Sequence, residues 1–277
     1  MGITSQARHF QDAIILFGDS LTQNCTGGSF AYRMTYAYQR KMDVLNRGFG
    51  DYNTEWALSL FKRLFPLRFG RSEFPQIKLI VIWLGTNDAV LPDDSPTPVP
   101  EDAEYDTGRS VPLAKYGTNL NKMIDSFTDS YSEYHLPGVR IALLTPPPVV
   151  LSMRKPGQAK VDLDHTRKYK DECLSVGKQW SRKSGGRVQP VDCWKAITDV
   201  ADGEKDDALR PFFTDGVHLS PNGYQVVFDE LMRIIKKNAN WKHLDPANIK
   251  ATVPRYNAVT DDWEWDYEPT PVQERKD

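Results

Sequence analysis

The fold is predicted from the stretch Ile14-Ile15-Leu16-Phe17-Gly18-Asp19-Ser20-Leu21-Thr22, which lies near the N-terminus. Its four leading apolar residues predict a short buried strand, which Gly18 and Asp19 then end. A serine that follows a buried parallel strand faces the crevice where open α/β sheets bind their ligands. Ser20 is therefore a candidate nucleophile, and the alternative is a polar turn without a chemical role.

Further apolar stretches alternate with helical patterns along the chain. The predicted strands cover residues 12–17, 42–46, 77–84, 139–145 and 188–191. Helical patterns cover residues 30–40, 112–134, 169–180 and 193–200, a segment that begins at Asn53 or Thr54, and a last helix that begins at Ser220. In the segment from Asn53 or Thr54, one face carries Trp56, Leu60 and Leu64. Over residues 112–134, one face carries Leu120, Ile124, Phe127 and Tyr131. This alternation indicates βαβ units and a parallel sheet.

Composition limits the class of protein. With 277 residues the chain can form one sizeable core, which favours one domain over two. A net charge of −2 with 26% charged residues gives no basic face for nucleic acid. No apolar run approaches the ~20 residues that span a bilayer, and the one near the N-terminus is too short for a signal peptide. The three cysteines have no metal-ligand spacing, which predicts a reducing, cytoplasmic location and no metal site.

An ester-hydrolysing serine needs a base, a group that orients the base, and donors for the developing oxyanion. Among the five histidines, His218 is distinctive because it lies in a turn directly before the last helix. Asp215 precedes it by three residues, and Gly216 between them permits a tight turn. Such a turn lets the carboxylate reach Nδ1–H and leaves Nε2 facing the serine. The alternative is a turn aspartate beside a structural histidine.

Three separated motifs then identify a family. Gly18-Asp19-Ser20-Leu21, Gly85-Thr86-Asn87-Asp88 and Asp215-x-x-His218 resemble, in order, motifs of the GDSL or SGNH hydrolases. The resemblance implies a three-layer α/β/α sandwich, flavodoxin-like, with about five mostly parallel strands. It also implies a Ser20–His218–Asp215 triad, with the Asn87 amide as an oxyanion donor and no metal or organic cofactor. We interpret Asp88 as structural.

A fourth motif is closer to one subgroup. Residues 45–56, Leu-Asn-Arg-Gly-Phe-Gly-Asp-Tyr-Asn-Thr-Glu-Trp, resemble the isoamyl acetate-hydrolysing esterases, in which a glycine N–H lines the oxyanion hole. Aligned without gaps, that glycine falls on Asp51, with Gly50 one place earlier. The expected oxyanion donors are therefore the Ser20 N–H, the N–H of Asp51 or Gly50, and the Asn87 amide. The position can require φ > 0, which Asp tolerates less well than Gly. The Asp51 carboxylate would have to face solvent or be paired, and Arg47 is one candidate partner.

The resemblance predicts a serine esterase acting on short-chain, acetate-type esters. Other activities of the superfamily stay open: carbohydrate O-deacetylase, thioesterase or lysophospholipase. Asp51 also leaves open a non-catalytic binding protein on this fold. Cys25 is a weaker nucleophile candidate because no motif surrounds it. The chain lacks the Gly-x-Ser-x-Gly sequence of α/β-hydrolases.

Two segments fall outside these motifs. Residues 91–110 are rich in proline and acidic residues, and with residues 146–165 they are expected to line the acyl and alcohol pockets. We predict a hydrolase domain over residues 1–240 and a C-terminal extension over 241–277. Residues 262–268 alternate aromatic and acidic side chains, which predicts an arm that packs on its own core or on a second subunit in a homodimer. The other expected partner is a small-molecule ester.

Overall fold

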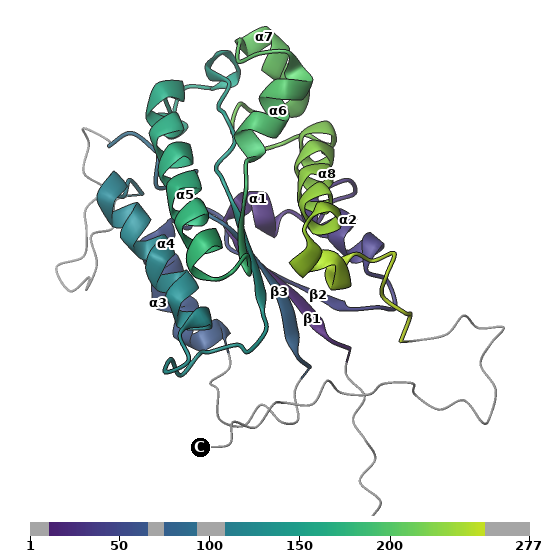
Figure 1. Ribbon diagram of the computed structural model, residues 1–277. Helices are drawn as coiled ribbons and strands as arrows, with labels where there is room; N and C mark the ends of the chain where they lie inside the picture. The colour runs from purple at the N-terminus through teal and green to yellow at the C-terminus, as the bar shows by residue number, and fades with distance from the viewer. Residues whose placement is uncertain (1–10, 66–74, 93–108, 253–277) are drawn as a thin grey trace, which may run out of the picture.

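The computed structural model describes residues 11–65, 75–92 and 109–252, and its centre is one five-stranded sheet (Figure 1). The strands are β1 (Ala13–Gly18), β2 (Asp43–Gly48), β3 (Ile77–Trp83), β4 (Arg140–Leu144) and β5 (Val188–Val191). They lie in the order β2-β1-β3-β4-β5, and every neighbouring pair is parallel. This is the flavodoxin-like order. The predicted α/β fold and all five predicted strands are confirmed.

The central strands are apolar on both faces because helices cover both. In β1, Ile14 and Leu16 pack into one core cluster, whereas Ile15 and Phe17 pack into the other. Successive side chains of a strand point to opposite faces, so a continuous apolar run fills two cores at once. All six residues of β1 are buried.

Helices form the two outer layers (Figure 1). The side chains of α2 (Phe30–Ala37), α6 (Cys193–Ala201) and α8 (Pro221–Lys237) belong to the first cluster. Those of α3 (Thr54–Leu64), α4 (Leu113–Thr128) and α5 (Leu163–Lys183) belong to the second. The result is the predicted three-layer α/β/α sandwich.

The end of α4 and the buried face of α3 differ from the sequence prediction. The predicted helix over 112–134 ends as α4 at Thr128, and Tyr131 is 91% exposed instead of on the apolar face. The Asp129 carboxylate accepts a hydrogen bond from Tyr131 N at 3.0 Å. Such local side-chain bonds offer the backbone an alternative to the helix.

In α3 the buried face is shifted by one residue. Ala57, Phe61 and Phe65 enter the core, whereas the expected face of Trp56, Leu60 and Leu64 is only half-buried. The two apolar stripes of this helix are offset by one residue, and helical periodicity alone does not indicate which of them is buried. The Phe61 and Phe65 rings pack against the Phe17 and Phe127 rings, with centroids 4.7 to 6.3 Å apart. Such aromatic pairs favour this face over its neighbour.

The core extends past residue 240. Trp241 and Leu244 lie in the 3₁₀ helix η4 (Ala239–Leu244) and are fully buried in the first cluster. Tyr38 donates a hydrogen bond to Leu244 O at 2.7 Å. The aromatic and acidic segment 262–268 and most of the proline-rich segment 91–110 lie outside the described residues. No helix in the described ranges is long and apolar enough to cross a bilayer.

Candidate active site

The sheet order brings three of the sequence motifs together at the C-terminal ends of the strands. Gly18 at the end of β1 pairs with Gly48 at the end of β2 and with Trp83 at the end of β3. Because these parallel strands end side by side, the residues that follow them share one crevice. Ser20 follows β1, which lies between the strands that lead to Asp51 and Asn87.

Ser20 is the first residue of α1 (Ser20–Gln23), a single helical turn that the sequence did not predict. A turn this short carries no periodicity by which to recognise it. Asp19 caps the turn, with Oδ1 accepting from Leu21 N at 2.9 Å. At Gly18 any Cβ would lie 2.4 Å from Trp83 O, so only glycine lets the chain pass here. Ser20 is thereby held where β1 meets α1.

The Asp19 carboxyl is buried beneath this turn. It is 1% exposed, and no described residue bonds its Oδ2. Burial raises the pKa of Asp19 to about 7, and the nearby Asp88 and Asp51 carboxylates add to the rise against hydrogen bonds that lower it. The folded protein therefore holds this carboxyl largely protonated below neutral pH.

Asp19 makes folding stability depend on pH. Its pKa is about 7 when folded, against an ordinary value of 3.8, so unfolding between these values releases a proton. This contribution is most favourable below about pH 4 and is lost as the pH rises to about 7. Asp19→Asn cannot ionise, so its melting temperature relative to wild type is expected to rise between pH 5 and pH 8.

Thermal melts at both pH values measure this difference. The control is Asp171→Asn, which changes a carboxylate with a 62% exposed side chain. Its melting temperature relative to wild type should not change between the two pH values. An equally constant difference for Asp19→Asn would show that the carboxyl is ionised in the folded protein throughout this range.

The structure brings His218 to Ser20 from the far end of the chain. His218 Nε2 lies 2.9 Å from Ser20 Oγ, and Nδ1 lies 2.9 Å from Asp215 Oδ2. The three predicted side chains therefore form one hydrogen-bonded line. With Nδ1 protonated toward the carboxylate, Nε2 is the acceptor for the serine proton.

The turn that carries His218 is fixed locally. Thr214 N donates to His218 O at 2.8 Å, which closes the loop. Gly216 has φ +87°, and a Cβ there would lie 2.2 Å from Val150 O. Both the backbone conformation and the lack of space therefore require glycine between Asp215 and His218.

Asp215 is held as a carboxylate. Its Oδ1 accepts from Val217 N at 3.0 Å and from His218 N at 2.8 Å. Partial burial acts to raise the pKa of Asp215, but the hydrogen bonds from His218 and Val217 outweigh it and hold the pKa below its usual value. Arg154 Nη1 lies 3.8 Å from Oδ2 and donates to Asp215 O at 3.2 Å. An ionised Asp215 can stabilise an imidazolium at His218.

Asp51 adopts the conformation that the sequence comparison anticipated. Its φ is +65°, in the left-handed region. Its side chain is 65% exposed and forms an ion pair with Arg109 at 3.2 Å, instead of with Arg47. The carboxylate thus faces solvent, while no described residue accepts a hydrogen bond from the Asp51 N–H. The Gly50 N–H, in contrast, donates to Gln23 Oε1 at 2.5 Å.

Asn87 joins the two segments that follow β2 and β3. It is 8% exposed, and its Nδ2 donates to Tyr52 O at 3.0 Å. A primary amide has two N–H groups, so a second one remains for a ligand. The neighbouring Asp88 accepts from Thr54 N at 3.0 Å and so braces the start of α3, the structural role predicted for it.

Sequence reasoning did not single out Gln23, Arg109 or Arg154 as contacts of the site. The last two lie far from their partners in the chain, and neither belongs to a recognisable motif. Gln23 follows Ser20 by three residues, and this spacing was the one feature of the sequence that could have indicated a contact with the site. Cys25, the other nucleophile candidate, is exposed and lies outside the hydrogen-bonded line.

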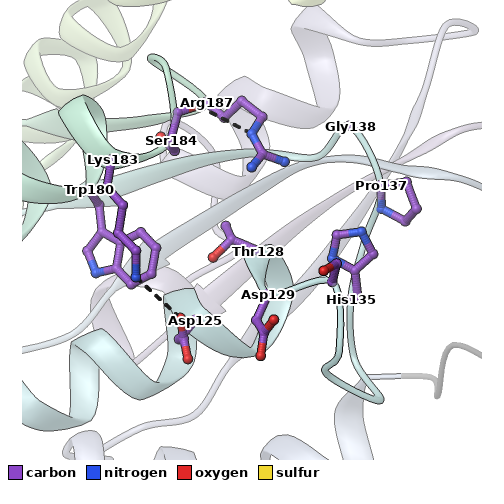
Figure 2. Close-up of a pocket in the computed structure, with 11 residues that line it drawn as sticks. Asp125, Thr128, Asp129, His135, Pro137, Gly138, Trp180, Lys183, Ser184 and Arg187 are labelled. Carbon is purple, nitrogen blue, oxygen red and sulfur yellow. Dashed lines mark hydrogen bonds and ion pairs between the residues drawn. The ribbon is translucent and has the colours of Figure 1, made fainter.

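A separate hollow of about 680 Å³ lies at the C-terminal ends of α4 and α5 (Figure 2). α4 leads into β4 and α5 leads into β5, so this hollow lies at the N-terminal ends of the strands, whereas Ser20 lies at their C-terminal ends. Its Lys183 lies 3.7 Å from Asp125 and 4.0 Å from the centre of the Trp180 ring. None of the predicted site residues lines it. Within the described ranges, no three His, Cys, Asp or Glu side chains could together hold a metal ion.

Known proteins match most of the chain. The sequence profile of the GDSL-like Lipase/Acylhydrolase family matches residues 16–226. A GDSL esterase/lipase of Arabidopsis thaliana is 30% identical over 261 residues, which cover 89% of this chain and 93% of that protein. The isoamyl acetate-hydrolyzing esterase 1 homolog of Homo sapiens is 28% identical over 235 residues, which cover 82% of each chain.

Solved structures share the fold. A lipase/acylhydrolase from Enterococcus faecalis superposes with a TM-score of 0.54 at 20% identity, over 88% of this chain and 100% of that one. A catalytic mutant of an acetylxylan esterase from Geobacillus stearothermophilus gives a TM-score of 0.53 at 17% identity, over 82% of this chain and 95% of that one.

Proposed function

Since the chain belongs to the GDSL-like lipase/acylhydrolase family and is a carboxylic ester hydrolase, we propose that Ser20, His218 and Asp215 form its catalytic triad. The observation that carries this proposal is the hydrogen-bonded line from Ser20 Oγ through His218 to Asp215. We further propose that the substrates are short-chain, acetate-type esters.

In this mechanism Ser20 Oγ attacks the acyl carbonyl carbon while its proton passes to His218 Nε2. Asp215 holds the imidazole in the required tautomer and stabilises the imidazolium. Collapse of the tetrahedral intermediate breaks the ester C–O bond, and His218 protonates the departing alcohol. Water then attacks the acyl-serine by the same route and releases the carboxylic acid.

The negative charge on the carbonyl oxygen needs fixed donors. We assign the Ser20 N–H, the Asp51 N–H and the second N–H of the Asn87 amide. The strand order supports the grouping, because these residues follow three adjacent parallel strands. The ion pair of Asp51 with Arg109 offsets the charge of a carboxylate near an oxyanion.

The acetate preference rests on relatives rather than on a shaped pocket. The human relative is described as a homolog of an isoamyl acetate-hydrolyzing esterase, and the Geobacillus protein that shares the fold is an acetylxylan esterase. Both descriptions name the removal of a two-carbon acyl group.

A panel of p-nitrophenyl esters tests the substrate class. At fixed alcohol, kcat/KM is expected to be highest for acetate and to fall at least tenfold by octanoate. Ser20→Ala serves as the blank, so that hydrolysis by surface groups is subtracted. A maximum at octanoate or longer would replace acetate esters by medium- or long-chain lipids as the substrate class.

A further inference from the structure

Gln23 connects the nucleophile's helix to the oxyanion turn, by which we mean residues 48–51. It is the last residue of α1 and lies three residues after Ser20. Its Oε1 accepts the hydrogen bond from the Gly50 N–H. This bond joins the element that carries the nucleophile to the backbone that carries a proposed oxyanion donor.

Other contacts join the same two elements. Phe49 N donates to Gly18 O at 2.9 Å, at the end of β1. Asn46 Nδ2 donates to Thr22 O at 2.9 Å, and Asn46 Oδ1 accepts from Gly48 N at 2.9 Å. The start of the turn is thus anchored to the backbone on both sides of Ser20.

The backbones of α1 and the turn also touch directly. A Cβ at Gly48 would lie 2.1 Å from Gln23 N, so this close approach requires glycine. The anchors described above hold residues 48 and 49, but not the tip of the turn. At Gly50 the described contact with α1 is the Gln23 side chain.

Gln23 already accepts the hydrogen bond of the Gly50 N–H, so the backbone donor left for an oxyanion is the Asp51 N–H. Gly50 and Asp51 present successive N–H groups, and successive N–H groups in a turn can converge on one anion. Gln23 takes the first of them, whereas no described residue accepts a hydrogen bond from the second. The left-handed conformation of Asp51, with φ +65°, follows directly after the bonded residue.

We infer that Gln23 is a positioning residue that fixes the oxyanion turn so that the Asp51 N–H, and not the Gly50 N–H, binds the oxyanion. The inference rests on the proposed function and names how its oxyanion hole is assembled. Without the Gln23 acceptor the tip of the turn loses its bond to α1. The donor must then be oriented during the reaction, which lowers the rate.

Gln23→Met tests this inference because methionine has similar length and no strong acceptor. We expect kcat on p-nitrophenyl acetate to fall about tenfold to a hundredfold, with KM changed less than threefold. Gln23→Glu keeps an acceptor for the Gly50 N–H and should retain more of kcat than Gln23→Met. The matched control is Gln189→Met, a partly buried glutamine on β5 that bonds Ser181 Oγ and Gly186 O. This control should keep wild-type kcat.

A second measurement separates positioning from general stability. The Ser20 hydroxyl adds to the carbonyl carbon of a trifluoromethyl ketone. A C–O bond forms, the serine proton passes to His218, and the former carbonyl oxygen becomes an oxyanion in the proposed oxyanion hole. Its inhibition constant is expected to rise for Gln23→Met in proportion to the loss of kcat/KM. If Gln23→Met does not fold, Gln23→Asn, which retracts the acceptor by one methylene, carries the same expectation.

The outcomes are distinct. Wild-type kcat and inhibition constant in Gln23→Met would overturn the inference while leaving the esterase intact. A loss of kcat with an unchanged inhibition constant would also overturn it, because the oxyanion hole would then be unaffected. Failure of the wild type itself to hydrolyse any ester would instead overturn the proposed function.

Discussion

Ser20→Ala is expected to lower kcat on p-nitrophenyl acetate by about 10⁶-fold, the loss typical when the nucleophile of a Ser-His-Asp triad is removed. The hydroxyl is the proposed attacking atom, and His218 Nε2 at 2.9 Å is its proton acceptor. Alanine removes both the attack and the hydrogen bond. Steady-state hydrolysis, with a fluorophosphonate label located by mass spectrometry, measures the effect.

The control for Ser20→Ala is Cys25→Ser, which changes the other nucleophile candidate. Cys25 is exposed, so its replacement should alter neither kcat nor the labelled position. Circular dichroism should show the same secondary structure for both variants and wild type. Near-normal turnover by Ser20→Ala would refute the triad, and lost labelling in Cys25→Ser would transfer the nucleophile to the thiol.

Asp215→Asn has the second largest expected effect, a loss of about 10⁴-fold in kcat. The carboxylate accepts a hydrogen bond from His218 Nδ1–H at 2.9 Å, which keeps the proton on Nδ1 and leaves Nε2 free to accept from Ser20. An asparagine amide nitrogen at that position would donate to Nδ1 and favour the tautomer with a proton on Nε2. That tautomer cannot accept the serine proton. The loss should lie in kcat, with KM changed little, because Asp215 does not touch the substrate.

A matched control for Asp215→Asn is Asp207→Asn, which changes a fully exposed aspartate with one weak ion pair to Arg210 at 4.0 Å. It should retain wild-type kcat. Protein NMR of the imidazole nitrogens should show the proton on Nδ1 in wild type and on Nε2 in Asp215→Asn. A kcat within tenfold of wild type in Asp215→Asn would remove Asp215 from the triad.

Much of the site could be predicted because its parts are local. Asp215 and His218 are joined by one turn, so the sequence between them, including Gly216, already specifies their approach. The strand before Ser20 is equally local, since a run of apolar residues followed by Gly-Asp-Ser defines both the strand and its end. Pairing Ser20 with His218, 198 positions away, required motifs from both ends of the chain.

Predictions failed where one local pattern allowed two outcomes. The apolar stripes of α3 differ by one residue, and packing on Phe17 and Phe127 decides which stripe is buried. The Asp51 carboxylate faces solvent and is paired, as the sequence required, but the one candidate partner named from the sequence was Arg47, a near neighbour. The partner in the fold is Arg109, from a segment beyond the third strand.

The order of strands and helices, the parallel sheet and the candidate triad could be predicted from the sequence. Short-range apolar patterns and turn residues encode the strands and helices, because each depends on backbone conformation over a few residues. The parallel sheet follows from their alternation, and the triad from the resemblance of motifs at both ends of the chain. The folded chain, and not a sequence pattern, brings Gln23 to the Gly50 N–H and places the exposed Asp51 carboxylate beside Arg109. Such contacts depend on how far a single side chain reaches between separate elements, and no periodicity in the chain records that distance.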